Sequence, residues 1–232
     1  RDLVSSDLVE VVTLDVIKRQ DKLSGIIKNA NLIINGKMMK TWKDTRDAYI
    51  IHEESDESIQ KKLIASIKRL LELGYTLDDV QVLVPQKRGS IGVYELNRLI
   101  QSIFNQNADS KLKNHHSAKV DLYFREGDKV IHIRNNYDKM WYQKDENGDY
   151  IPLNKFGVTN GETGVIDKID TMTIAEDGQI KTKRRIVVKY EFGYIFYLQG
   201  SEIRELDHAY ALSIHKSQGS QWPSIIIPIS RQ

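Results

Sequence analysis

Cysteine is absent from the 232 residues of this chain. Its absence excludes a disulfide scaffold and any thiolate zinc site, and it suits the reducing cytoplasm, where we expect the protein to work. Long hydrophobic runs are also missing. No apolar stretch approaches the ~18 residues of a membrane span, and no signal peptide opens the chain, so we expect no membrane partner.

An excess of charge of one sign is lacking as well. Lys and Arg total 34 against 32 Asp and Glu, which gives a net charge of +2. A charge this small neither requires nor excludes binding to nucleic acid. Any basic surface on this protein must therefore be local.

Familiar catalytic motifs are missing too. The sequence has no GxxxxGKS or GxxxxGKT phosphate loop and no acidic Mg²⁺ motif after a predicted strand. No serine-, cysteine- or glycosidase-type catalytic set is present. His52, His115, His116 and His132 have no partners at metal-ligand spacing. We therefore predict no metal site, and we expect that this chain cannot hold a nucleoside triphosphate alone.

The first part of the chain alternates predicted strands and helices. Two helices carry clear end signals. Ser24 is a suitable N-cap for a helix that Gly36 ends, and Asp56 is the predicted cap of a strongly amphipathic helix that Gly74 ends. Strands are predicted at 9–14, 49–51 and 80–84, and a further helix carries the apolar residues of 93–104. This order favours a parallel sheet covered by helices.

The pattern changes after residue 105. Residues 105–119 are polar and indicate a linker, and residues 120–199 contain short apolar runs separated by Gly-containing turns, which is typical of a small β-barrel. Strands are expected at 129–133, 164–169, 185–190, 194–198, 208–214 and 224–229. The predicted fold is an α/β domain of residues 1–118 plus 205–232, with a small β-barrel of residues 119–204 inserted in it. Because the chain opens at Arg1 and closes just after an apolar strand, we expect it to be part of a longer protein.

Polar residues follow three of the predicted strands, and ligands bind at the carboxyl ends of strands in open α/β sheets. One set is a loop between the last two strands: His215, Lys216, Ser217, Gln218, Gly219, Ser220 and Gln221. Lys supplies a charge for phosphate, and Gly lets the backbone approach a ligand. The other two sets are Arg19-Gln20 and Lys87-Arg88. Taken alone, the loop of residues 215–221 is equally compatible with a solvated connection. Arg19 alone fits a surface salt bridge better, and Lys87-Arg88 alone fit a solvated basic turn better, but three sets at one edge of a sheet favour a site.

The predicted barrel carries a second candidate surface. Arg134, Asn135, Asn136 and Tyr137 combine a cation, two amides and an aromatic ring, which suits stacking of bases and contact with a sugar–phosphate backbone. Trp141 and Tyr142 follow, and packing of these aromatics in or around a barrel core is an equally good interpretation. The four cations of residues 181–185 indicate a solvated strand edge.

Several segments resemble the RecD/TraA-like superfamily 1 DNA helicases, in the same order along the chain. Residues 206–220, LDHAYALSIHKSQGS, resemble motif V of that family, and residues 12–20 resemble its motif IV segment. Residues 24–36 and 80–97 resemble the units that follow motif IV, and residues 127–130, 134–137 and 160–164 are similar to the family's inserted SH3-like domain.

The resemblance implies the second RecA-like domain of a helicase that hydrolyses ATP and moves 5′ to 3′ on single-stranded DNA. It implies that Arg19 is the motif IV arginine that reaches the γ-phosphate, with Gln20, Gly219 and Gln221 near the nucleotide. The DNA path would follow Lys87, Arg88, Arg134, Asn135, Asn136, Tyr137, His215, Lys216, Ser217 and Gln218. ATP and Mg²⁺ would be held mainly by the first RecA-like domain, which would be the partner of this part.

The sequence departs from the family in two respects. Gln221 stands where the family usually has a Glu after Gly-Ser, so a carboxylate contact to the ribose is not available here. The phosphate loop, the Mg²⁺-binding acid, the pin and the motif VI arginine are not in these residues, so we expect the chain alone to be inactive as an ATPase. A non-catalytic DNA-binding or docking module with the same fold remains the alternative. The residues leave open whether nuclease subunits take part, and whether the process is repair, recombination or conjugation.

Overall fold

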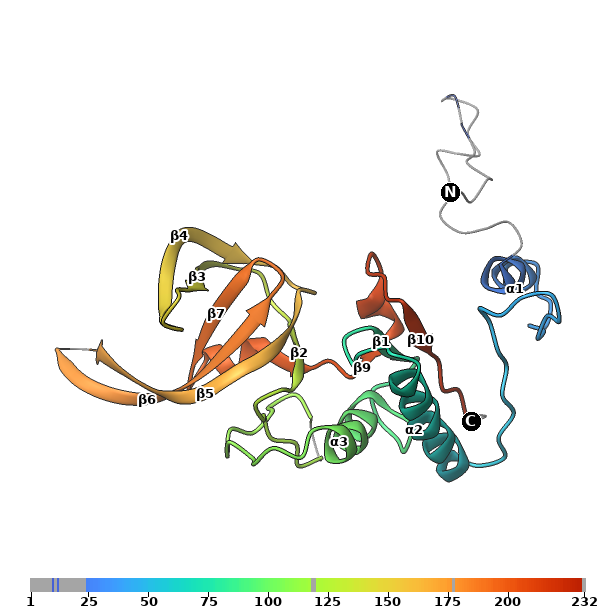
Figure 1. Ribbon diagram of the computed structural model, residues 1–232, viewed down its shortest axis with the longest axis horizontal. Coiled ribbons are helices and arrows are strands. Elements are labelled where there is room, and N and C mark those ends of the chain that lie inside the picture. The colour runs from blue at the N-terminus through green and yellow to red at the C-terminus, as the bar shows by residue number, and fades with distance from the viewer. Residues whose placement is uncertain (1–9, 11, 13–23, 118–119, 177, 231–232) are drawn as a thin grey trace. The chain divides into compact units, whose positions relative to one another are not determined.

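The computed structural model describes residues 10, 12, 24–117, 120–176 and 178–230. The chain divides into two compact units, Arg1–Glu53 and Glu54–Gln232 (Figure 1). Apart from residues 10 and 12, the strand predicted at 9–14 lies outside the described residues, and so do the motif IV residues Arg19 and Gln20.

The first unit contains the helix α1, Gly25–Ile34. The Ser24 hydroxyl accepts hydrogen bonds from the amides of Ile26 and Ile27, as the sequence predicted. Gly36, with φ of +67°, ends the helix in a left-handed turn. The strand predicted at 49–51 is wrong: the described backbone forms no strand there, and the amide of Ile50 donates to the Thr41 hydroxyl instead of to a neighbouring strand.

The second unit begins with the helix α2, Asp56–Glu72. Its N-cap is Ser55, one residue before the predicted Asp56, and Ser55 and Ser58 cap each other's backbone amides. Gly74 ends the helix as predicted, with φ of +95°. Because residue 74 needs the left-handed region of backbone space, glycine is the favoured residue there.

A three-stranded parallel sheet follows. β1 (Val80–Val84) lies between β10 (Ser224–Ile226) and β9 (Ala211–Ser213), and both pairings are parallel. The helix α3, Val93–Phe104, packs with α2 and this sheet around Leu63, Leu96 and Ile100. The predicted parallel sheet with helices is thus present on a small scale.

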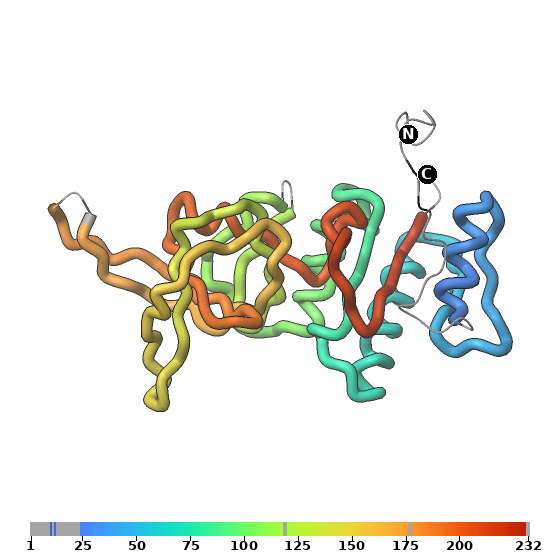
Figure 2. The backbone as a smooth tube through the Cα atoms, turned by 90° about the horizontal axis from the view of Figure 1, so that it is seen from above, coloured from blue at the N-terminus to red at the C-terminus, as the bar shows by residue number. Residues whose placement is uncertain are grey.

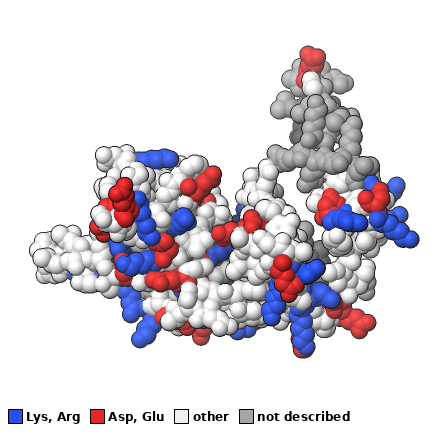
Figure 3. Space-filling view, viewed as in Figure 1, with Lys and Arg blue, Asp and Glu red and all other residues white. Residues whose placement is uncertain are grey.

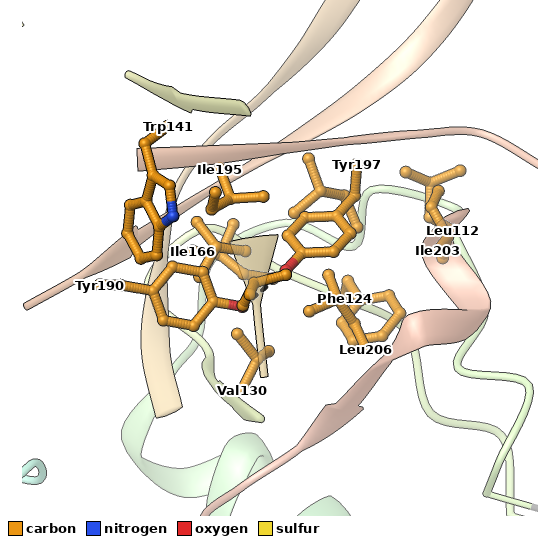
Figure 4. Close-up of a cluster of buried hydrophobic side chains, with 13 residues drawn as sticks. Leu112, Phe124, Val130, Trp141, Ile166, Tyr190, Ile195, Tyr197, Ile203 and Leu206 are labelled. Atoms are coloured by element: carbon orange, nitrogen blue, oxygen red, sulfur yellow. Dashed lines mark hydrogen bonds between the residues drawn. The ribbon is translucent and has the colours of Figure 1, made fainter. Parts of the chain in front are cut away.

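The larger sheet is antiparallel and has seven strands in the order β4-β3-β7-β6-β5-β2-β8. Its strands are β2 (Lys129–His132), β3 (Asn136–Lys144), β4 (Tyr150–Val158), β5 (Thr163–Glu176), β6 (Gln179–Tyr190), β7 (Gly193–Leu198) and β8 (Leu206–His208). A short 3₁₀ helix, η1 (Glu202–Glu205), precedes β8. The hydrophobic core of this sheet contains Phe124, Trp141, Tyr190 and Tyr197, which Figure 4 shows in one cluster. The hairpin of β5 and β6 extends beyond the rest of this sheet (Figure 2).

The segment 206–213 crosses from one sheet to the other. The sequence predicted one strand at 208–214, but the structure has two: β8 pairs with β2, and β9 pairs with β1. Only Ala209 and Tyr210 separate them. The buried Gln81 side chain donates to both of their carbonyl oxygens, at 3.1 and 3.2 Å, and so fixes the crossing.

Buried Lys129 joins the same two sheets. Its ammonium donates to three backbone carbonyl oxygens before and in β1, at 3.2–3.3 Å, those of Leu77, Asp78 and Val80. Burial lowers the pKa of Lys129 to about 8. The amino group at the start of β2 is therefore bound to the chain that leads into β1.

One further interpretation from the sequence is wrong, and another is confirmed in part. Residues 105–119 are not a solvated linker, because Leu112, Asn114 and Ser117 are buried. In residues 181–183, β6 pairs with β5 alone, so the predicted strand edge is present there. Arg185 is paired with β7 as well and forms two hydrogen bonds with Asp170.

Candidate functional site

The carboxyl ends of β1 and β9 lie next to each other, because the strands are parallel and Val84 is paired with Ser213. The loops that leave these two strands therefore meet. Lys87 from the first loop and Lys216 from the second line the same small cleft. Its other lining residues are Val93, Tyr94, Asp207, His208, Leu212 and Ser213. Two of the three predicted strand ends are thus brought together.

The loop with Lys87 and Arg88 is held against the start of α3. The amide of Val93 donates to the Gln86 carbonyl at 3.2 Å, and that of Tyr94 donates to the Lys87 carbonyl at 3.4 Å. Gly92 allows this closure: a Cβ there would lie 2.5 Å from the backbone carbonyl of Arg88. Both cationic side chains are left exposed.

The second loop begins as a 3₁₀ turn, η2, Ile214–Ser217. The Ser217 hydroxyl donates to the Ile214 carbonyl at 2.8 Å, so it is used inside the turn. Gly219, with φ of +86°, reverses the chain. His215, Gln218, Gly219 and Gln221 are exposed, whereas Lys216 is half-buried in the cleft.

The charges of the cleft favour an anion. Burial lowers the pKa of Lys216, the Asp207 carboxylate partly raises it again, and the Lys87 charge lowers it further. Lys216 Nζ lies 3.7 Å from Asp207 Oδ2. Burial also raises the pKa of Tyr94, so its hydroxyl stays protonated and able to donate. Two cations against one carboxylate leave one positive charge for a ligand such as a phosphate.

Asp207 and Tyr94 belong to the cleft but were not singled out from the sequence as site residues. Tyr94 follows Gly92 and Val93 in the first turn of α3, and its place beside a strand end was the available signal. Asp207 gave no such signal, because it lies in β8, which belongs to the other sheet.

No group of three or more His, Asp or Glu side chains that could hold a metal ion exists among the residues that the structure describes. Within the same residues, no helix is long and apolar enough to cross a membrane. On the face drawn in Figure 3, the described Lys and Arg side chains alternate with Asp and Glu and form no continuous basic surface.

The comparison with known families shows which family the region around the larger sheet resembles. The family model of the SH3 domain of ATP-dependent RecD-like DNA helicases matches residues 96–190. Residues 96–190 therefore contain a RecD-like SH3 domain.

Two relatives extend the similarity beyond the RecD-like SH3 domain. The ATP-dependent RecD2 DNA helicase of Deinococcus radiodurans is 23% identical over 224 residues, which are 97% of this chain. An uncharacterized protein of Methanocaldococcus jannaschii is 30% identical over 199 residues, 80% of this chain. The chain spans only 25% and 16% of the lengths of these two relatives. The chain is therefore related to RecD-like helicases over nearly all of its length.

The candidate DNA residues of the RecD-like SH3 domain lie between β2 and the start of β3. Arg134, Asn135 and Tyr137 are exposed. Asn136 instead donates to both carboxylate oxygens of Glu205, at 3.0 and 3.1 Å. None of the four lines the cleft described above.

The two aromatic residues after them are part of the folded RecD-like SH3 domain. Trp141 is 3% exposed in its core and donates to the Gly157 carbonyl at 2.7 Å. Tyr142 stacks on Phe196, with ring centroids 3.9 Å apart. Packing is therefore the correct interpretation for Trp141.

A buried polar network connects the RecD-like SH3 domain to the lining of the cleft. The Asp128 carboxylate accepts hydrogen bonds from Gln101, Asn105, Tyr210 and His208, at 2.7–3.1 Å. A fifth bond, from the amide of Arg125, is 2.7 Å long. Because His208 lines the cleft as well, the domain and the cleft share one hydrogen-bonded core.

Proposed function

We propose that this chain provides the single-stranded DNA contacts of the second RecA-like domain of a RecD-like helicase. The parent would be an ATP-dependent 5′–3′ DNA helicase. The observation that carries the proposal is the cleft at the carboxyl ends of β1 and β9, where Lys87 and Lys216 converge beside a RecD-like SH3 domain. A motor must pass every sequence, so these cations would bind phosphates, with little preference among bases.

The described residues do not fit Mg²⁺ and ATP by themselves. They contain no cluster of three or more His, Asp or Glu side chains that could hold a metal ion, and the sequence has no phosphate loop. The proposal therefore leaves ATP and Mg²⁺ mainly to a first RecA-like domain. Arg19 would reach into that site as the motif IV arginine, with Gln20, Gly219 and Gln221 nearby.

Domain organisation follows from the same proposal. Residues 1–118 and 205–232 would form the RecA-like domain, and residues 119–204 would form the SH3-like insert. Arg88 and the loop of His215, Lys216, Ser217 and Gln218 would follow the DNA backbone. Arg134, Asn135 and Tyr137 would extend that path along the insert, and Asn136 would support it from its contact with Glu205.

A titration with fluorescently labelled dT oligomers at two salt concentrations tests the DNA contacts. We expect dissociation constants of about 10⁻⁴–10⁻⁶ M, and an affinity that falls with salt by roughly 0.7 log unit per log unit for each phosphate contact. Lys87→Ala/Arg88→Ala should weaken binding and flatten the salt dependence.

The matched control is Lys61→Ala/Arg69→Ala, which removes two exposed cations from α2 and changes the net charge equally. Equal effects of the two double variants would contradict a local contact. Duplex binding as strong as single-strand binding would remove the main support for a motor.

The second candidate function is a non-catalytic single-stranded DNA-binding or docking module. The absence of a phosphate loop from the upstream part of the longer protein would favour it. A phosphate loop upstream in the longer protein, together with DNA-stimulated ATP hydrolysis, would decide for the motor.

A further inference from the structure

We propose that Asp207 is a positioning residue of the cleft: its buried carboxylate fixes the Lys216 ammonium beside Lys87, so that both cations meet the same DNA phosphate. This inference rests on the proposed function for its ligand. It concerns a residue of the other sheet, outside the loop that would touch DNA.

The Asp207 carboxylate is itself held rigidly. It is 6% exposed, and its Oδ1 accepts hydrogen bonds from Asn114 Nδ2 at 2.8 Å and from the His208 amide at 2.9 Å. Asn114 is fixed in turn, because its Oδ1 accepts from the His116 amide at 2.8 Å. With Oδ1 engaged in this way, Oδ2 lies toward Lys216 Nζ, 3.7 Å away.

Without a fixed partner, the Lys216 side chain would occupy many rotamers. It lies in a four-residue 3₁₀ turn that has no buried residue, and a lysine side chain has many rotamers to lose on ordering. Residues 208–213, between the two partners, are fixed by pairing with β2 and β1. The carboxylate therefore holds the Lys216 ammonium in one position relative to the two sheets.

The same carboxylate favours the charged form of Lys216. The groups that face Lys216 are Asp207 and His208 from β8, Lys87 from the loop after β1, and Tyr94 from α3, with Arg88 close to Tyr94. Burial and the Lys87 charge both favour the neutral amine, whereas Asp207 favours the ammonium. Removing the negative charge would leave only the groups that promote loss of the proton.

Asp207→Asn removes the negative charge and keeps the hydrogen bonds that stabilise the fold. The amide oxygen can still accept from Asn114 and from the His208 amide, but the attraction to Lys216 is lost. We expect weaker binding of a labelled dT oligomer, and we expect its alkaline loss to move to lower pH by about one unit. Adding Lys216→Arg should abolish that pH shift, because a guanidinium keeps its proton.

Asp121→Asn is the matched control. It makes the same chemical change in an exposed ion pair with Lys113, outside the cleft, and should leave both the affinity and the pH profile unchanged. Asp207→Glu keeps the charge but displaces it, so it should weaken binding with little change in the pH profile. If Asp207→Asn does not fold, Asp207→Glu is the variant that tests the proposal. An unchanged affinity of Asp207→Glu for the dT oligomer would then overturn it.

An NMR titration of the Lys216 side-chain methylene beside Nζ makes the test independent of DNA. Its midpoint should fall in Asp207→Asn and stay in Asp121→Asn. An unchanged midpoint would overturn the positioning role. A shifted midpoint in a protein that binds no dT oligomer would instead refute the proposed function and leave the contact between Asp207 and Lys216 standing.

Discussion

Asp128 Oδ2 and His208 Nε2 lie 3.0 Å apart, and both side chains are fully inaccessible to solvent. The pair joins the turn before β2 to β8, the strand that leads toward the cleft. His208 Nδ1 lies 2.8 Å from the Asn114 amide nitrogen, which can only donate. The neighbours thus assign the ring hydrogen to Nε2, facing Asp128, and make Nδ1 the acceptor.

Asp128→Asn should destabilise the protein strongly. The carboxylate accepts five hydrogen bonds, and an amide would place its own N–H groups against some of those donors. Loss of one partner from a buried charged network costs about 3–5 kcal/mol in the free energy of unfolding. Urea unfolding followed by circular dichroism measures it. Asp121→Asn, at an exposed ion pair, should cost about 0–1 kcal/mol, and similar values for the two variants would contradict the network's role.

Gly92→Ala should distort the loop that carries Lys87 and Arg88. Its new Cβ would lie 2.5 Å from the Arg88 carbonyl carbon and oxygen, which are backbone atoms and cannot rotate away. We expect a loss of about 1–3 kcal/mol in the free energy of unfolding, with weaker binding of dT oligomers. Gly25→Ala crowds Thr45 and Asp47 in the first unit and serves as the comparison. Equal dT affinity of Gly92→Ala and wild type would show that the loop geometry does not matter for binding.

Parts of this fold that depend on local signals could be predicted from the sequence. The Ser24 cap, the Gly36 and Gly74 stops and the strand β1 each follow from a few neighbouring residues. The split of residues 206–213 between two sheets could not be predicted, because an apolar run carries no information on which partner it pairs with. The burial of Asn114 could not be predicted for a related reason: its partners Asp207 and His208 lie more than 90 residues away along the chain.

The candidate site was predicted in the same partial way. Lys87 and Lys216 could be placed together because both follow parallel strands, and the carboxyl ends of parallel strands share one edge. Trp141 could not be assigned, since an aromatic residue in a β-strand fits a core and a stacking surface equally well. Asp207 was missed because its proximity to Lys216 depends on contact between the two sheets, which no local pattern encodes.

His132 should make the protein sensitive to mild acid. The side chain is fully buried beside the Tyr197 hydroxyl, 3.0 Å from Nδ1, and burial, with the nearby Lys139 charge, lowers its pKa from 6.5 to about 4. The unfolded chain therefore takes up the proton first as the pH falls. The free energy of unfolding should decrease between about pH 6.5 and pH 4, by roughly 1.4 kcal/mol for each unit of the pKa difference.

Urea unfolding at several pH values between 4 and 7 measures this dependence. His132→Gln cannot titrate, so its free energy of unfolding should vary less with pH than that of the wild type, although its value at pH 7 is lower. His52→Gln, at an exposed position of the first unit, should keep the wild-type dependence. The same pH dependence in His132→Gln and wild type would refute the assignment.

The last prediction concerns Arg19 and needs the longer protein that contains this chain. If Arg19 is the motif IV arginine, Arg19→Ala should slow DNA-stimulated ATP hydrolysis by about 10³–10⁵-fold, because an arginine finger stabilises charge that develops in the transition state. The affinity for single-stranded DNA should change little, since the proposed DNA contacts lie elsewhere. Phosphate release at saturating dT oligomer measures the rate. Lys18→Ala removes the neighbouring cation and should leave the rate near that of wild type, and the 232-residue chain without a phosphate loop should release no phosphate. If Arg19→Ala stays within a few-fold of wild type, Arg19 has no part in ATP hydrolysis.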